Sequence, residues 1–260
     1  MLGVFWNIRG LNSPTKTDKL KELIRANNPD FICISETKKE EFSILQIEKF
    51  DPGSNFHWKW LPAINTTGGV LLGCKIDTLD IIQCDLHKFC ISCLVRNKQD
   101  NFVWKLTTVY GSAYDQFKLD FINELHYILA SWAGPTLVGG DFNLIREASE
   151  KSSGAINQHR ADLFNDWINK FGLIELKING RKFTWGNNQD NLVMATIDRV
   201  FMSTDWAFEF PGVHLKALPR LGSDHTPLVL NTCAFPIHKS KLFRFEKWRL
   251  RALERLVLKP

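Results

Sequence analysis

Short apolar runs typical of β-strands alternate with amphipathic helices along most of the chain, and this alternation restricts the fold more than any other feature. The first run spans 2–7, a helix is expected over 15–27, and a second run follows Pro29 at 31–35. Two strands joined by a helix usually lie parallel, with the helix covering one face of the pair. The beginning of the chain therefore predicts an α/β unit.

The same alternation continues to residue 231. Runs at 69–74, 89–95 and 103–110 predict an antiparallel meander. Further helices are expected over 115–132 and 160–171, and further strands over 136–138, 182–185, 196–202, 213–218 and 227–231. Strands mixed with helices over the whole length predict a layered α/β fold, and a chain of 260 residues suits one large domain.

The last segment, 236–260, is basic and differs in character from the rest. From Lys239 onward, eight basic and two acidic residues give a charge of +6, so the preceding residues sum to −1 within a total of +5. A nearly neutral body argues against a protein that holds nucleic acid by bulk charge alone. We predict one domain over 1–235 and a basic linker or appended helix over 236–260. Aromatic residues in this tail could also stack on bases, but packing on sequence further downstream explains them more simply.

The cysteines and the apolar runs limit the cellular setting. No apolar run approaches the roughly 20 residues that cross a bilayer, and the first residues are typical of a strand rather than a signal peptide. Cys90 and Cys93 form a CxxC pair without a second pair of ligands, which argues against structural zinc. Buried, reduced thiols favour an intracellular protein.

Polar residues gather where the apolar strands end. The clusters are Asn7, Glu36, Asp141 with Asn143, Asp198, and Ser223-Asp224-His225. In open α/β sheets, ligands bind beyond the carboxyl ends of the strands. Four of these clusters also have an ordinary explanation. Glu36 could cap the next helix, and Asp141 could belong to a turn. Asp198 could pair with Arg199, and His225 could be a plain loop histidine. Taken singly, the ordinary explanations are preferred.

The combination is more specific than its parts. Carboxylate and amide oxygens, with one histidine and no cysteine set, suit a hard cation such as Mg²⁺. Phosphodiester hydrolysis needs an in-line nucleophile, stabilisation of charge on the phosphoryl oxygens, and help for the leaving oxygen. One aspartate can hold the water, an acidic pair the metal, and a protonated histidine the phosphoryl oxygen. A second aspartate can keep that histidine charged. We therefore expect metal-dependent phosphodiester chemistry.

Six short segments around these residues form an ordered set. They are Trp6-Asn7-Ile8-Arg9-Gly10, Ser35-Glu36-Thr37, Val109-Tyr110-Gly111, Gly140-Asp141-Phe142-Asn143, Ile197-Asp198-Arg199 and Ser223-Asp224-His225. In this order they resemble the exonuclease–endonuclease–phosphatase superfamily, over residues 1–231. Within it, segments 139–145, 183–185 and 222–227 are most similar to the endonuclease domains of LINE-type (non-LTR) retrotransposons of plants. Segment 243–248 resembles the stretch that leads toward the reverse transcriptase in such polyproteins.

The resemblance implies a fold, a cofactor and a set of roles. The implied fold is a four-layer sandwich of two mixed β-sheets packed face to face with helices outside, and the implied cofactor is Mg²⁺, which Mn²⁺ could replace. The implied metal ligands are Glu36, Asp224 and Asn7. The implied catalytic residues are Asp141 and Asn143 at the water, His225 and Tyr110 at the phosphate, and Asp198 behind the histidine. Family positions that contact DNA or support the site are Thr184 and Ser223, which we assign to DNA binding with Arg9.

Two positions depart from the abasic-site repair enzymes of this superfamily. Arg9 stands where those enzymes have an aspartate near the metal, and Ala195 stands where they have an aromatic wall. Both differences weaken an abasic-repair assignment without changing the hydrolytic residues. Arg9 could instead contact the DNA backbone, or it could be an ordinary surface residue.

The resemblance therefore predicts a Mg²⁺-dependent endonuclease that nicks double-stranded DNA to leave a 3′-hydroxyl and a 5′-phosphate. In this family that hydroxyl primes reverse transcription, so we expect a nuclear protein whose parent polyprotein also holds a reverse transcriptase domain. One alternative is a phosphatase or phospholipid diesterase of the same superfamily, because fold alone does not fix the substrate. Another is a catalytically idle retroelement fragment that only binds DNA.

Overall fold

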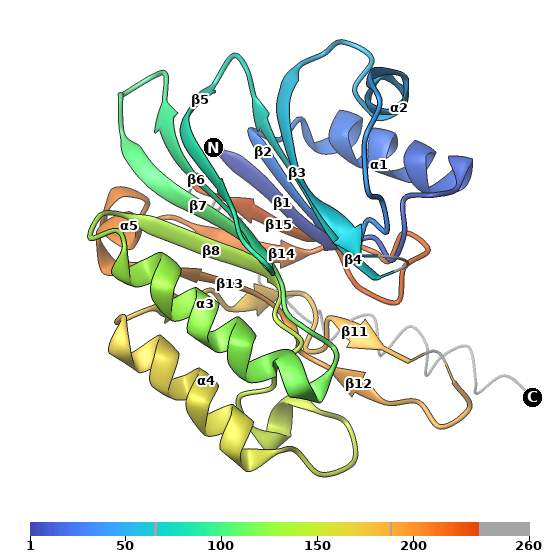
Figure 1. Ribbon diagram of the computed structural model, residues 1–260, viewed down its shortest axis with the longest axis vertical. Helices are drawn as coiled ribbons and strands as arrows, with labels where there is room; N and C mark the ends of the chain where they lie inside the picture. The colour runs from blue at the N-terminus through green and yellow to red at the C-terminus, as the bar shows by residue number, and fades with distance from the viewer. Residues whose placement is uncertain (65–66, 188, 234–260) are drawn as a thin grey trace, which may run out of the picture.

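The computed structural model describes residues 1–64, 67–187 and 189–233, so the predicted tail at 236–260 lies outside the described residues. Within these ranges the strands form two large mixed sheets and a short hairpin (Figure 1). The first sheet has the order β10 (Ile178–Asn179), β14 (His214–Ala217), β15 (Leu228–Asn231), β1 (Leu2–Asn7), β2 (Phe31–Ser35), β4 (Thr67–Lys75) and β3 (Phe56–Ile64). The second has the order β5 (Leu79–Leu86), β6 (Cys90–Asn97), β7 (Val103–Tyr110), β8 (Thr136–Asp141), β13 (Asp198–Met202) and β9 (Ile174–Glu175).

The remaining elements are one hairpin and several helices. The hairpin pairs β11 (Trp185–Gly186) with β12 (Met194–Ala195). The helices are α1 (Pro14–Asn27), α2 (Ile44–Phe50), α3 (Lys118–Ala130), α4 (Gln158–Lys170) and α5 (Thr204–Glu209), with 3₁₀ turns at Asp115–Phe117 and Ala148–Glu150. Across the described ranges, no helix combines the length and apolar character needed to cross a membrane.

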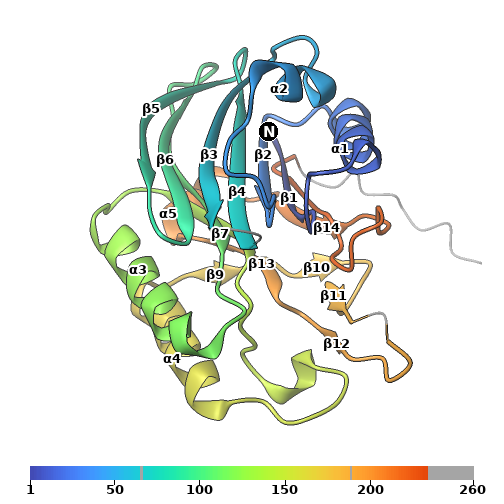
Figure 2. The ribbon, with the colours of Figure 1, turned by 45° about the vertical axis from the view of Figure 1, so that its right-hand side comes forward.

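The elements stack in four layers, as predicted. Side chains such as Phe5, Leu106 and Leu137 fill the space between the two sheets. On the outer face of the first sheet, α1 and α2 cover Trp6 and its neighbours. On the outer face of the second, α3 and α4 cover an aromatic cluster around Phe142. Figures 1 and 2 show the two helix pairs on opposite sides of the stacked sheets. Apolar surface is therefore buried at the three interfaces between the four layers, and this burial holds the layers together.

Strand direction brings the polar strand ends to one edge. β1 lies parallel to β2, and β7 lies parallel to β8, so the carboxyl end of each pair falls at a common edge. β13 runs antiparallel to β8, and its first residue, Asp198, lies opposite Asp141, the last residue of β8. The edge thus collects the ends of four strands and the beginning of a fifth.

The predicted meander is only partly correct. β6 and β7 pair antiparallel in the second sheet, but β4 belongs to the first sheet, where it lies between β2 and β3. The strand predicted over 182–185 is also wrong, since only Trp185 of this segment lies in a strand. Apolar runs indicate strands but do not say which sheet they join.

Candidate active site

A cleft of about 560 Å³ opens at the edge where the polar strand ends meet. Seven predicted site residues line it: Arg9, Glu36, Tyr110, Asp141, Asn143, Asp224 and His225. The other four are buried polar residues, namely Asn7, Asp198, Thr184 and Ser223. Each of these four hydrogen-bonds to a residue of the cleft or to its supporting backbone. The structure thus brings all the sequence candidates into one region.

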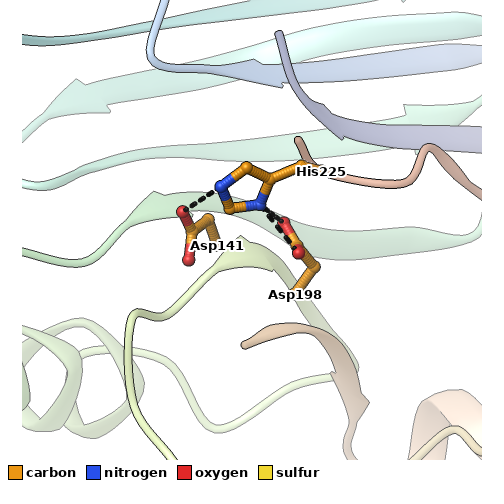
Figure 3. A group of neighbouring side chains, drawn as sticks. All are labelled: Asp141, Asp198 and His225. Atoms are coloured by element: carbon orange, nitrogen blue, oxygen red, sulfur yellow. Dashed lines mark hydrogen bonds and ion pairs between the residues drawn. The ribbon is translucent and has the colours of Figure 1, made fainter. Parts of the chain in front are cut away.

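His225 lies between two buried aspartates (Figure 3). Its Nδ1 is 2.9 and 3.1 Å from the two carboxylate oxygens of Asp198, and its Nε2 is 3.8 Å from Oδ2 of Asp141. Burial would lower the pKa of His225, but the charges of Asp198 and Asp141 and the hydrogen bond to Asp198 raise it to about 9. The imidazole is therefore a cation held against the cleft.

The pKa of Asp141 is also raised, which for a carboxyl group favours the neutral form. Burial raises its pKa to about 7, and the nearby Asp198 adds to this effect, while the charge of His225 and hydrogen bonds from Asn7 and Asn143 lower it. A carboxyl group with this pKa can accept a proton near neutral pH. Asp141 and His225 thus form a base and an acid side by side.

Asn7 joins this pair to Glu36. Its amide nitrogen donates to Oε2 of Glu36 at 3.1 Å and to Oδ2 of Asp141 at 2.9 Å, while its oxygen accepts from the backbone of Arg9 at 2.9 Å. Glu36 has a left-handed backbone with φ of 54°, and it does not cap a helix, because Ser43 caps α2. Lys38 lies 3.1 Å from the other Glu36 oxygen. Asn7 and Lys38 thus hold the Glu36 carboxylate at the wall of the cleft.

Asp224 has one engaged oxygen and one that has no partner. Oδ2 forms an ion pair with Arg9 and accepts a hydrogen bond from Nε1 of Trp185 at 2.9 Å. Oδ1 is buried and has no hydrogen-bond partner in the described part of the chain. A buried carboxylate oxygen without a donor is costly unless a cation meets it. Asp224 therefore fits a metal ligand.

Asn143 and Tyr110 complete the wall of the cleft. Asn143, with a left-handed φ of 50°, donates its backbone N–H to Asp141 at 2.9 Å and its amide to the Gly111 carbonyl at 2.8 Å. Tyr110 ends β7, and burial, followed by the charges of Glu36 and Asp141, raises the pKa of its hydroxyl. The phenol therefore stays protonated and can donate a hydrogen bond.

Thr184 and Ser223 lie beneath the cleft. The Thr184 hydroxyl is fully buried and accepts from the backbone N–H groups of Ile197 and Asp198 at 3.2 and 3.1 Å. The Ser223 hydroxyl donates to the Asn7 carbonyl at 2.8 Å and accepts from the His225 N–H at 3.1 Å. These contacts give both residues a supporting role, and contact with DNA remains a prediction.

The sequence does not predict two contacts of the site. Nε1 of Trp185 donates to Asp224, and the Lys38 ammonium reaches Glu36 from two residues away. The proposed pairing of Asp198 with Arg199 is wrong. Neighbouring residues of a strand point to opposite faces, and Arg199 instead binds Glu150 and Glu175 on the far side of β13.

The site contains groups able to hold a metal ion. Asp141, Asp198 and His225 offer ligand atoms within 4.8 Å of one another. However, Nδ1 of His225 is bonded to Asp198, and its raised pKa leaves the ring protonated, without a lone pair for a metal. Glu36 and the unpartnered oxygen of Asp224 are oxygen ligands of the kind that hard divalent cations prefer. The chemistry of these two carboxylates, which both line the cleft, suits a divalent cation.

The chain belongs to the Endonuclease/Exonuclease/phosphatase family, whose sequence pattern matches residues 4–225. The family comprises nucleases and phosphatases that hydrolyse phosphate esters. No match was found among curated protein sequences.

Solved structures share this fold at low sequence identity. The endonuclease domain of TRAS1, a telomere-specific non-LTR retrotransposon, has a TM-score of 0.69 at 15% identity, covering 88% of this chain and 97% of that one. The AP endonuclease of Leishmania major has a TM-score of 0.68 at 14% identity, covering 88% and 86%. The 3′ phosphatase NExo from Neisseria, bound to a product DNA hairpin, has a TM-score of 0.68 at 16% identity, covering 89% and 98%.

The charge state of His225 gives a first prediction. In the metal-free protein its pKa should lie near 9, above the ordinary 6.5, and Asp198→Asn should lower it, because burial remains while the main raising charge is lost. The stabilisation from the protonated ring is complete below pH 6.5 and is lost as the pH rises through about 9. A ¹⁵N NMR titration of the imidazole measures this pKa, and an equal value in the variant would contradict the prediction.

The loop that carries Glu36 gives a second prediction. Thr37 and Lys38 donate backbone N–H groups to the carbonyls of Gly69 and Gly68, each at 3.0 Å. Gly69 has φ of 83°, and a Cβ there would lie 2.3 Å from Oγ1 of Thr37. Gly69→Ala should lower the free energy of unfolding by about 1–3 kcal/mol through backbone strain. The steric clash with Thr37 should lower it further. Gly172→Ala is the control, since its φ is 57° with open space around it. Equal losses of unfolding free energy in the two variants, measured by urea denaturation, would contradict the close contact between Gly69 and Thr37.

Proposed function

We propose that the protein is a Mg²⁺-dependent endonuclease that nicks one strand of double-stranded DNA. The observation that carries this proposal is the placement of a protonated His225 beside Asp141, with Asp198 behind the ring and Glu36 and Asp224 across the same cleft. This set supplies a cationic hydrogen-bond donor, a base and oxygen ligands for a cation around one space. Phosphodiester hydrolysis needs these three functions together.

Glu36 and Asp224 would hold the cation, with Asn7 orienting Glu36. A bound divalent ion supplies charge neutralisation at the phosphoryl oxygens. Asp224 keeps one buried oxygen for this purpose, while Arg9 and Trp185 fix the other. The Arg9 guanidinium is half exposed and thus also faces solvent, where a DNA phosphate can meet it.

The protein groups would activate the water and bind the phosphoryl oxygens. Asp141 orients a water and accepts its proton as the water oxygen bonds to phosphorus, and Asn143 holds Asp141 in place. The bond from phosphorus to the 3′-oxygen breaks, and that oxygen leaves with a proton taken from solvent. His225 and Tyr110 donate hydrogen bonds to the phosphoryl oxygens, where negative charge grows. The products are a 3′-hydroxyl and a 5′-phosphate.

Two structural similarities support DNA as the substrate. One neighbour is a retrotransposon endonuclease domain, and another was solved with a DNA hairpin product. We propose that this chain derives from a LINE-type element of a plant, that it acts in the nucleus, and that its 3′-hydroxyl product primes a reverse transcriptase of the parent polyprotein. Segments 183–185 and 222–227, which resemble the endonuclease domains of LINE-type elements, support this origin.

A nicking assay tests the proposal. Supercoiled plasmid incubated with the protein and Mg²⁺ should relax to open circles, EDTA should stop the reaction, and a DNA polymerase should extend the nicks without phosphatase treatment. Faster turnover of inositol phosphates or sphingomyelin than of duplex DNA would favour the phosphatase or phospholipid diesterase alternative. DNA binding without relaxation under any divalent cation would favour an idle fragment.

A further inference from the structure

A second hollow, here called the hairpin groove, adjoins the catalytic cleft. It has a volume of about 450 Å³ and lies between described residues of β3 and β4 and the segment that follows β7. Leu61, Pro62 and Ile64 contribute from the hairpin, and Phe89, Tyr114 and Phe117 contribute from the facing side. Glu36, Tyr110 and Ala113 line both the groove and the cleft, so the two are continuous.

The groove combines apolar walls with a charged end. Tyr114 is 59% exposed and Ile64 is 71% exposed, so apolar surface is left in contact with water beside the catalytic residues. The Lys88 ammonium lies 5.0 Å from the Phe89 ring centre and 4.7 Å from that of Phe117, and it forms an ion pair with Asp120 at 2.9 Å. Glu36 stands at the end shared with the cleft. The middle of the groove thus suits an uncharged, flat group.

Described residues of both walls form hydrogen bonds that hold them in the structure. On the hairpin side, Ala63 donates its N–H to the Lys39 carbonyl at 2.8 Å, which joins the hairpin to the Glu36 loop. On the other side, the buried Ser112 hydroxyl accepts from the Tyr114 N–H at 3.0 Å and donates to the Tyr114 carbonyl at 3.2 Å. A preformed apolar surface binds a ligand with little ordering cost.

We propose that the hairpin groove binds one unstacked nucleobase of the strand being cut, next to the scissile phosphate. This inference rests on the proposed function, because the shared residues Glu36 and Tyr110 place the groove one step along the strand from the reacting phosphate. Aromatic side chains bind bases through stacking that tolerates any sequence. Tyr114 supplies the exposed ring, and Phe117 contributes apolar surface beside it.

DNA binding without divalent cations tests the groove separately from catalysis. Fluorescence anisotropy in EDTA would compare wild type with Tyr114→Ala, which should weaken binding of a labelled duplex about 5- to 150-fold. Tyr114→Phe keeps the ring and should bind like wild type. Tyr127→Ala is the matched control, because Tyr127 is 67% exposed on α3 outside the groove. Circular dichroism and thermal unfolding would confirm that each variant is folded.

Substrates that each lack one base identify the position. An abasic analogue placed in turn along one strand should weaken wild-type binding at a single site, and Tyr114→Ala should show no such site. Equal affinity of Tyr114→Ala and wild type, or an equal loss at every abasic position, would overturn the proposal. A changed oligomeric mass in Tyr114→Ala with unchanged DNA affinity would overturn it in favour of contact between copies. Wild type that binds DNA in this pattern but never nicks it would refute the endonuclease and leave the groove standing.

Discussion

Asp141→Asn is expected to lower the kcat for DNA nicking by about 10²- to 10⁴-fold. The amide matches the carboxylate in size, but it cannot accept a proton from water. Asp141 lies buried at the end of β8, where its raised pKa of about 7 suits a base near neutral pH. The affinity for DNA in EDTA should change little, because the groups assigned to phosphate remain.

The measurement is the initial rate of plasmid relaxation at saturating DNA. Asp166→Asn on α4 provides the control for an equivalent chemical change, because Asp166 is exposed and lies outside the cleft. It should nick at the wild-type rate. A decrease in kcat of less than ten-fold for Asp141→Asn would contradict the assignment of Asp141 as the base.

His225→Ala is expected to reduce kcat by about 10²- to 10³-fold, the cost of losing one donor to a charged transition state. It should also destabilise the fold by about 3–5 kcal/mol, because Asp198 would be left as a buried charge without its partner. The double variant His225→Ala with Asp198→Ala should recover part of this stability, but none of the activity. That separation distinguishes the catalytic role of the ring from its role in packing.

Nicking rates and urea denaturation measure the two effects. His57→Ala is the control, because His57 is an exposed histidine of β3. Full activity in His225→Ala, or a double variant that is no more stable than the single one, would contradict the proposed His225–Asp198 pair.

Much of the fold could be predicted from local patterns. The strand at 2–7 and the strand at 31–35 are continuous apolar runs buried on both faces, which makes their ends visible in the sequence. Other strands carry weaker signals. β5 is half exposed and has a register irregularity between Ile81 and Gln83, which breaks the alternation of apolar and polar residues. β3 contains Pro62, which an edge strand tolerates.

The site was predictable as a list of residues but not as a set of contacts. Polar residues after buried strands identified Asn7, Glu36 and Asp141, because strand ends at one edge collect ligands. The sequence could not reveal that Asn7 bridges Glu36 and Asp141, since this contact depends on how the two sheets stack. The ion pair of Arg9 with Asp224 joins positions 215 residues apart and is equally invisible.

The position of the divalent cation tests the account most directly. Crystals soaked in Mn²⁺ and measured by anomalous diffraction should show a peak bounded by Glu36 and Asp224, with His225 outside the coordination sphere. The buried oxygen of Asp224 that has no donor in the described residues should be among the ligands. A peak coordinated by His225 between Asp141 and Asp198, or no peak in the cleft, would contradict the account.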